Sequence, residues 1–251
     1  MARTTIQLCG RYVVELAGDR VESRLPGRQG RLLLAYLVLN RDRPVGRSRL
    51  VDALWSGELP RDPADALAAL LSKLRATLGN DLVAGRGELQ LMLPADARVD
   101  VEEAVAGLHK AESACSLGDW PRAWSASLGA QIVARRTLLG EYEAAWIDEW
   151  RRELEDVYQR SLECYVRACL GLGGTELAGA ERAARRLVRA APLRESATAL
   201  LMEALEARGN AAEALLVYEA LRTRLRDELG VPPAEPLQAA YRRLLGSPAA
   251  G

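Results

Sequence analysis

The stretch that decides the fold of the N-terminal part is DPADALAALLSKLRATLG, residues 62–79. Asp62 is a residue type that caps helices, Pro63 suits the first helical position, and Asp65 stands where the helix dipole favours negative charge. Gly79 is typical of a helix end. Between these residues the leucines recur at steps of three and four, which predicts an amphipathic helix with one buried row: Leu67, Leu70, Leu71, Leu74 and Leu78.

The chain before this helix predicts short strands and two further helices. Residues 6–8, 12–16 and 21–25 read as short half-buried strands. Residues 27–40 and 46–55 carry apolar side chains at helical spacing. Three helices in succession, the second shorter than the others, favour a helix-turn-helix arrangement.

A hairpin is predicted directly after the third helix. The runs 82–84 and 89–93 are apolar and flank Gly85-Arg86-Gly87, so a basic residue lies at the tip. Strands, three helices and a terminal hairpin together predict an α+β winged helix-turn-helix domain over residues 1–94. On this pattern alone, a small α+β domain without a nucleic-acid role is the alternative.

Residues 95–251 are predicted to be almost entirely helical. Glycines at 118, 174 and 209 end helices, and a small residue follows each of them five positions later, which allows two helices to approach closely. Gly174 and Gly209 are thirty-five positions apart, within one residue of the TPR repeat. The fold class is therefore mainly α, a winged helix-turn-helix followed by an all-α TPR-like domain. Helices are predicted at 101–117, 121–136, 146–172, 177–190, 194–208, 212–229 and 234–245.

The charge of the chain is balanced overall but uneven along its length. The whole sequence has 34 basic and 34 acidic residues, whereas residues 1–93 carry fourteen Lys and Arg against ten Asp and Glu. A basic head is consistent with a surface that meets phosphate. We find neither a secretory signal nor an apolar run near the roughly 18 residues that cross a membrane, so a cytoplasmic location without membrane contact is expected.

The candidate nucleic-acid contacts surround the third helix. Opposite its leucine row lie Asp65, Ala69, Ser72 and Ala76, with Lys73 beside them, and this face is expected to enter the major groove. Alanines there limit base reading to thymine methyl groups. The predicted DNA-binding residues are Arg43, Arg47, Arg49, Ser72, Lys73, Arg75 and Arg86.

Two tryptophans are candidates for binding a partner protein. Trp146 and Trp150 are four residues apart and share one helical face. Packing inside the helical domain is the default interpretation, and an exposed groove for a partner is the alternative hypothesis.

Catalytic, metal and cofactor sites are not predicted. The chain has one histidine, and its four cysteines (Cys9, Cys115, Cys164 and Cys169) form no CxxC pair, so they are interpreted as small buried hydrophobes. The glycine-rich residues 171–174 follow a helix rather than a strand, which favours a turn over a phosphate loop.

The N-terminal part contains three characteristic segments, at 27–37, 49–55 and 70–75, and residues 95–251 contain others at 192–195, 209–215, Tyr218 and 227–233. The first group resembles the DNA-binding half of the SARP/AfsR-type regulators of actinobacteria, and the second resembles the bacterial transcriptional activator domain of the same family. The resemblance covers nearly the whole chain and implies binding of double-stranded promoter DNA by the winged helix. It also implies homo-oligomerisation or contact with RNA polymerase or a sigma factor through the helical domain, and no catalysis.

Two functions from different classes remain open on the sequence. The first is a DNA-binding transcription regulator, an activator that works as an oligomer. The second is an adaptor whose degenerate winged helix no longer binds DNA and whose TPR-like domain holds a protein partner.

Overall fold

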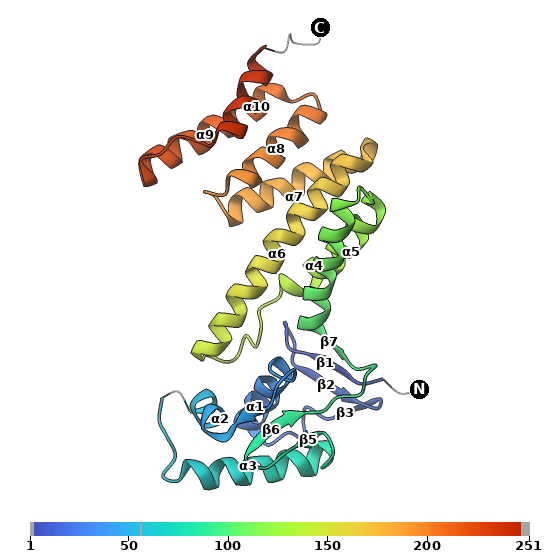
Figure 1. The fold of residues 1–251 in the computed structure, drawn as a ribbon, viewed down its shortest axis with the longest axis vertical. Coiled ribbons are helices and arrows are strands. Elements are labelled where there is room, and N and C mark those ends of the chain that lie inside the picture. Colours follow the sequence, from blue (N-terminus) through green and yellow to red (C-terminus); the bar gives the residue numbers. More distant parts are fainter. Residues whose placement is uncertain (1–2, 56, 247–251) are drawn as a thin grey trace. The chain divides into compact units, whose positions relative to one another are not determined.

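A computed structural model describes residues 3–55 and 57–246 of the chain (Figure 1). These residues form two compact units, and each unit is made of two separate ranges of the sequence. The N-terminal unit consists of residues up to 104 together with 133–154, and the helical unit consists of 105–132 together with the residues from 155 onward. The compact units do not divide the chain at a single position, so the predicted domain boundary at 94 stays a prediction.

The N-terminal unit combines two small sheets with three complete helices among its described residues (Figure 1). Strand β1 pairs with β2 in antiparallel fashion and with β7 in parallel fashion, which gives the order β3-β2-β1-β7. The second sheet has the order β4-β6-β5. The elements are β1 (Thr5–Gln7), β2 (Val13–Leu16), β3 (Asp19–Arg20), α1 (Gly27–Leu39), β4 (Val45–Gly46), α2 (Arg47–Leu54), α3 (Pro63–Leu78), β5 (Val83–Ala84), β6 (Glu88–Leu91) and β7 (Arg98–Val99).

Most predicted elements of this unit are confirmed, and one strand is wrong. The helices of 27–40, 46–55 and 62–79 and the hairpin of 82–93 are present within one or two residues of the expected bounds. The strand expected at 21–25 ends instead at Arg20, and the following residues turn. Val21 and Leu25 are buried all the same, because apolar side chains four positions apart fit a turn as well as a strand.

Residues 133–154 are tied to the first sheet by backbone hydrogen bonds. The amide of Gly10 donates to the carbonyl of Thr137 at 2.8 Å, and the amide of Leu139 donates to the carbonyl of Leu8 at 3.0 Å. The guanidinium of Arg151 then donates to the carbonyls of Leu138, Leu139 and Tyr142 at 2.8–3.1 Å. This segment is therefore an integral part of the N-terminal unit.

The carboxylate of Asp100 fastens the first strand to the start of α4. It accepts hydrogen bonds from the backbone amides of Leu8 at 3.0 Å, Cys9 at 2.8 Å and Val101 at 2.9 Å. Burial raises the pKa of Asp100, and these hydrogen bonds oppose the rise because they favour the charged form.

We predict that Asp100→Ala lowers the free energy of unfolding by about 3 kcal/mol, since buried amides lose their acceptor. Urea unfolding followed by tryptophan fluorescence measures the change. Glu103→Ala is the matched control, because it removes only an exposed ion pair with Arg98 and is expected to change the free energy of unfolding far less. Equal effects of the two substitutions would contradict the fastening role of Asp100.

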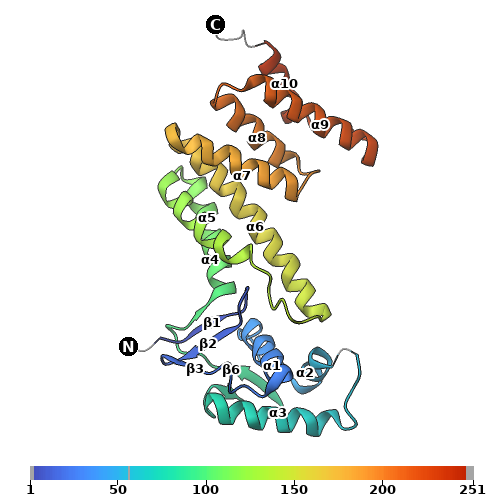
Figure 2. The same ribbon diagram turned by 180° about the vertical axis from the view of Figure 1, so that it is seen from behind.

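The helical unit is a series of helices that pack on their neighbours in chain order (Figure 2). Helix α7 packs on α8, α8 packs on α9, and α10 covers α8 and α9. The predicted helices are confirmed within two residues at each end. Their bounds are α4 (Asp100–Ser116), α5 (Trp120–Ala134), α6 (Ala145–Leu172), α7 (Leu177–Ala190), α8 (Glu195–Ala207), α9 (Ala211–Leu229) and α10 (Glu235–Gly246), with a short 3-10 turn at Gly174–Glu176. The first residues of α4 and α6, up to 104 and 154, and the last two of α5 belong to the N-terminal unit.

Small residues after the turns allow the close helix packing that the sequence predicts. Ala123 and Ala214 are completely buried. A Cβ atom at Gly179 would lie 3.2 Å from the Tyr165 hydroxyl, so a larger residue there would require the tyrosine side chain to shift by a few tenths of an ångström. The stacked helix hairpins therefore confirm the helical-repeat prediction.

The cysteines behave as buried hydrophobes with one exception. Cys9, Cys164 and Cys169 are buried as expected, whereas Cys115 is only half-buried. Burial raises the pKa of Cys164 to about 12 and that of Cys169 to about 11, so both thiols stay protonated at neutral pH. Among the described helices, none combines the length and apolar character that crossing a bilayer requires.

Candidate nucleic-acid interface

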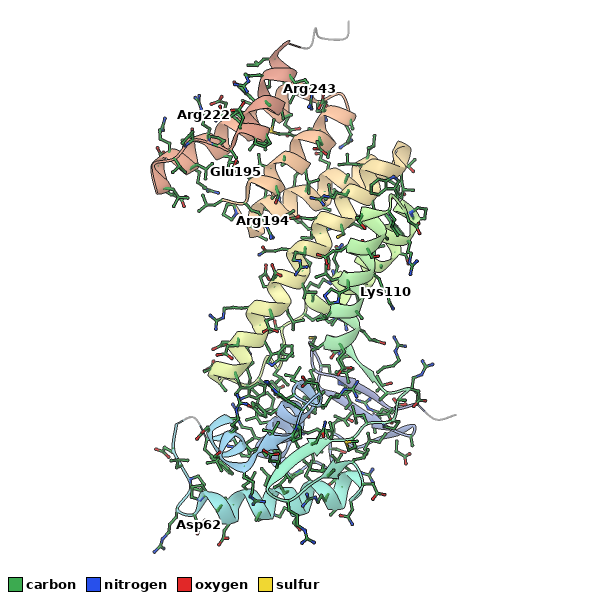
Figure 3. All side chains as sticks on the ribbon, in the orientation of Figure 1. Asp62, Lys110, Arg194, Glu195, Arg222 and Arg243 are labelled. Atoms are coloured by element: carbon green, nitrogen blue, oxygen red, sulfur yellow. The ribbon has the colours of Figure 1, made fainter. Side chains whose placement is uncertain are left out.

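Helix α3 buries one side and leaves the other open within its unit. Asp62 caps its N-terminal end by accepting from the Asp65 amide at 3.0 Å (Figure 3). Four of the five predicted leucines are buried, at 0–9% exposure, against α1 and α2. Leu70 is the exception and is half-buried, because it lies at the edge of the row.

The opposite face of α3 is exposed, as the sequence predicts. Asp65, Ala69, Ser72, Lys73 and Ala76 are all exposed in the structure. Ala64 and Ala68 extend the same surface. A helix face about this long fits the major groove of B-form DNA, while its short side chains leave little material for hydrogen bonds to bases. That this face contacts DNA stays a prediction.

The hairpin after α3 is a three-stranded wing rather than a two-stranded one. Strand β4, which the sequence did not predict, pairs with β6 through Val45 opposite Leu89 and Gly46 opposite Glu88. The first residue of α2 follows β4 directly, so the start of α2 is held beside the wing.

Basic side chains gather where α2 begins and where the wing turns. Arg47 donates to the carbonyl of Arg86 at 3.3 Å, which brings the two predicted residues together. Arg43, Arg49 and Arg86 are exposed, and among the described residues none of the three takes part in an ion pair. Their charges are therefore available to an outside anion.

Arg75 was predicted to contact DNA, but the structure shows its guanidinium engaged by the wing. Its Nε donates to the carbonyl of Val83 at 3.1 Å, and its Nη2 donates to the carbonyl of Gly85 at 2.6 Å. The side chain is half-buried because it crosses from α3 to β5. Arg75 thus positions the wing, and we leave it out of the proposed DNA contacts.

We predict that Arg75→Met frees the wing without unfolding α3. Amide hydrogen exchange across residues 83–91 should accelerate roughly tenfold, the scale expected when hydrogen bonds from a charged donor are lost. Lys73→Met is the matched control, because this exposed side chain on the same helix makes no side-chain hydrogen bond to the described residues. Exchange in the wing that responds equally to both variants would refute the positioning role.

The two candidate tryptophans lie at the beginning of α6, inside the N-terminal unit. Trp146 Nε1 donates to the carbonyl of Ala53 at 3.0 Å, and its ring meets Tyr36 edge-on with centroids 5.1 Å apart. These contacts match the packing interpretation, although its partners lie in α1 and α2 and not in the helical unit. Trp150 is half-buried, and its role in partner binding stays a prediction.

Sequence reasoning missed two exposed polar residues at helix starts, Ser48 on α2 and Arg61 before α3. Their positions at the starts of two predicted helices were the signal in the sequence that could have identified them. A hollow of about 370 Å³ separates these helices, with Asp52 and Asp62 in its lining. Arg47 also lines this hollow, but the two carboxylates outnumber its one guanidinium group. A phosphate is therefore less favoured there than beside the exposed Arg43, Arg49 and Arg86.

The exposed third helix, the basic start of α2 and the wing define a winged helix-turn-helix protein with a helical-hairpin unit. Residues 99–245 match the family described as bacterial transcriptional activator domain. The chain belongs to this family and to the SARP/AfsR-type transcription regulators that carry the domain.

Individual relatives are similar over most of this chain. It is 33% identical over 228 residues to the regulatory protein AfsR of Streptomyces coelicolor. This alignment covers 86% of this chain and 22% of AfsR. It is 29% identical over 260 residues to the transcriptional regulatory protein EmbR of Mycobacterium tuberculosis. That alignment covers 97% of this chain and 63% of EmbR. The chain thus spans less than two thirds of either relative.

A solved structure shows the same fold. Mycobacterium tuberculosis EmbR in complex with a low affinity phosphopeptide matches with a TM-score of 0.83 at 24% identity, over 97% of this chain and 65% of that one. The expected fold, N-terminal α+β followed by stacked helices, is confirmed by this likeness.

Proposed function

We propose that the chain is a transcription regulator that binds promoter DNA, with α3 in the major groove and the wing and the start of α2 on the phosphate backbone. The observation that carries this proposal is the exposed outer face of α3 flanked by basic side chains outside any ion pair among the described residues. Family membership supports the same function.

The backbone contacts come from three places around α3. Arg43 and Arg49 flank the start of α2, Arg86 lies at the wing tip, and Lys73 lies on α3 itself. The N-cap of α2, Gly46, offers no side chain, so the first amides of that helix stay open to a phosphate oxygen. These contacts would position the protein on DNA without reading its sequence.

Base reading would rest on few side chains. Lys73 can donate to guanine, Ser72 can donate or accept, and the alanines can touch thymine methyl groups. One such helix face discriminates only modestly between DNA sequences. We therefore propose that an oligomer bound to repeated sites supplies the remaining sequence specificity. In this proposal the helical unit joins copies of the chain or contacts RNA polymerase or a sigma factor, and the regulator acts as an activator.

The alanine-rich face of α3 also supports the second candidate function, a protein-binding adaptor that has lost DNA binding. The two candidates differ in one measurable property, which is retention of duplex DNA at physiological salt.

We predict that the full chain retards DNA from upstream of its own coding region in a mobility-shift assay, and retains it better than shuffled DNA near 0.15 M salt. Lys73→Glu or Arg49→Glu should weaken binding about tenfold and lower the salt slope by about one or more, because each removes a phosphate contact. Arg122→Glu is the control, because this exposed arginine lies on α5 in the helical unit.

Each other outcome has a defined meaning. No retention at any salt would refute DNA binding and favour the adaptor. Retention that ignores sequence would limit the chain to non-specific contact. A Lys73→Glu protein that binds like the unchanged chain would refute the docking of α3.

A further inference from the structure

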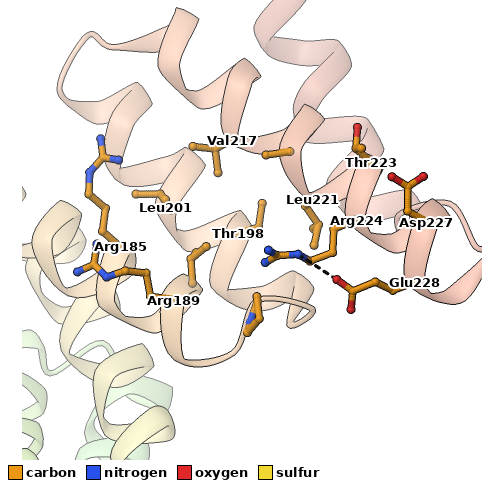
Figure 4. A pocket seen from close by; sticks show the side chains of 13 residues that line it. Arg185, Arg189, Thr198, Leu201, Val217, Leu221, Thr223, Arg224, Asp227 and Glu228 are labelled. Atoms are coloured by element: carbon orange, nitrogen blue, oxygen red, sulfur yellow. Dashed lines mark ion pairs between the residues drawn. The ribbon is translucent and has the colours of Figure 1, made fainter.

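The helical unit contains a groove of about 530 Å³ between α7, α8 and α9 (Figure 4). A volume of this size holds a few large side chains of a ligand. Its floor is apolar and includes Val188, Leu201, Val217 and Leu221. Arg185 and Arg189 lie together on the α7 side, and Arg224 reaches in from α9 (Figure 4).

The charges of the groove are only partly compensated. Arg185 is satisfied by Glu181 at 2.9 Å and Glu213 at 2.6 Å. Arg189 is exposed and takes part in no ion pair among the described residues. The unmet charge on the α7 wall is therefore positive.

The α9 wall adds a second cation that a ligand can recruit. Arg224 pairs with Glu228 at 3.2 Å, and both side chains are about half exposed, at 48% and 53%. An exposed pair one helical turn apart is weak, so a carboxylate brought by a ligand can replace Glu228. Asp227, the other acid of the lining, forms an exposed ion pair with Arg226 at 2.8 Å, which is weak for the same reason but lowers the negative charge that Asp227 presents to the groove. Two guanidinium groups thus face each other across an apolar floor.

We propose that this groove docks an acidic amphipathic peptide segment of a partner protein, with apolar side chains on the floor and carboxylates on Arg189 and Arg224. A nucleic acid fits the site less well, because the lining contains no aromatic ring on which a base could stack. The proposal names the kind of partner for the helical unit within the proposed function, and it does not depend on whether α3 binds DNA.

Fluorescence anisotropy with the full chain tests the proposal. The probe is a short fluorescein-labelled peptide in which pairs of glutamates alternate with pairs of leucines. Lysine replaces glutamate in one comparison peptide, and serine replaces leucine in another. We expect saturable binding of the first peptide alone, a loss of about tenfold or more in Arg189→Glu, and retention in Arg189→Lys, because only the former reverses the charge.

Two further variants separate groove binding from a general effect of charge. Arg186→Glu makes the same charge change on α7 at an exposed residue outside the groove lining, and it should bind as the unchanged chain does. Ala220→Trp adds bulk at an exposed lining position and should abolish binding while leaving the melting temperature unchanged.

The outcomes that would overturn the proposal are specific. They are absence of binding, equal binding of the lysine or serine peptide, equal loss in Arg186→Glu and Arg189→Glu, or binding that persists in Ala220→Trp. Competition by duplex DNA for the peptide would assign the groove to nucleic acid instead. Retardation of DNA by the same variants is measured separately, so failure of the groove and failure of DNA binding are distinguishable.

Discussion

The burial of one leucine row on α3 is the constraint on which the N-terminal unit depends. Each buried leucine contributes about 1.5–3 kcal/mol, and a rotation of the helix by one residue would expose several of them while forcing either Ser72 or Lys73 inward, depending on its direction. The core therefore fixes which residues α3 presents outward. The surface available to a duplex is set by hydrophobic packing before any property of DNA is considered.

Two polar side chains then hold the surrounding pieces against this core. Arg75 binds wing carbonyls, and Asp100 collects amides from the first strand and from its own helix start. Asp100 thereby gives partners to backbone amides in a part-buried place, and Arg75 does the same for the carbonyl of the buried Val83. Because Arg75 is committed in this way, the exposed cations around α3 are those of Arg43 and Arg49 near the start of α2, Lys73 on α3 and Arg86 at the wing tip.

Local signals in the sequence predicted most helices and the face of α3, because caps, glycine stops and apolar spacing act within a few residues. The strand expected at 21–25 was wrong, since Val21 and Leu25 suit a buried turn equally well. Strand β4, the wing contacts of Arg75 and the placement of Trp146 against Tyr36 depend on residues distant in the chain. No periodicity reports such contacts, which is why the candidate DNA-binding set contained one residue with a positioning role.

The return of residues 133–154 to the N-terminal unit has a consequence for how the protein is made. During synthesis the winged helix emerges from the ribosome long before the stretch that completes its packing. Tyr36 and the carbonyl of Ala53 lack their contacts until Trp146 has been made. The bridge between Cys9, beside the first sheet, and Leu138 likewise forms only after Leu138 has been made. Domains generally fold as units as they are synthesised, so this one reaches its final form only after the segment that ends at Leu154 has been translated.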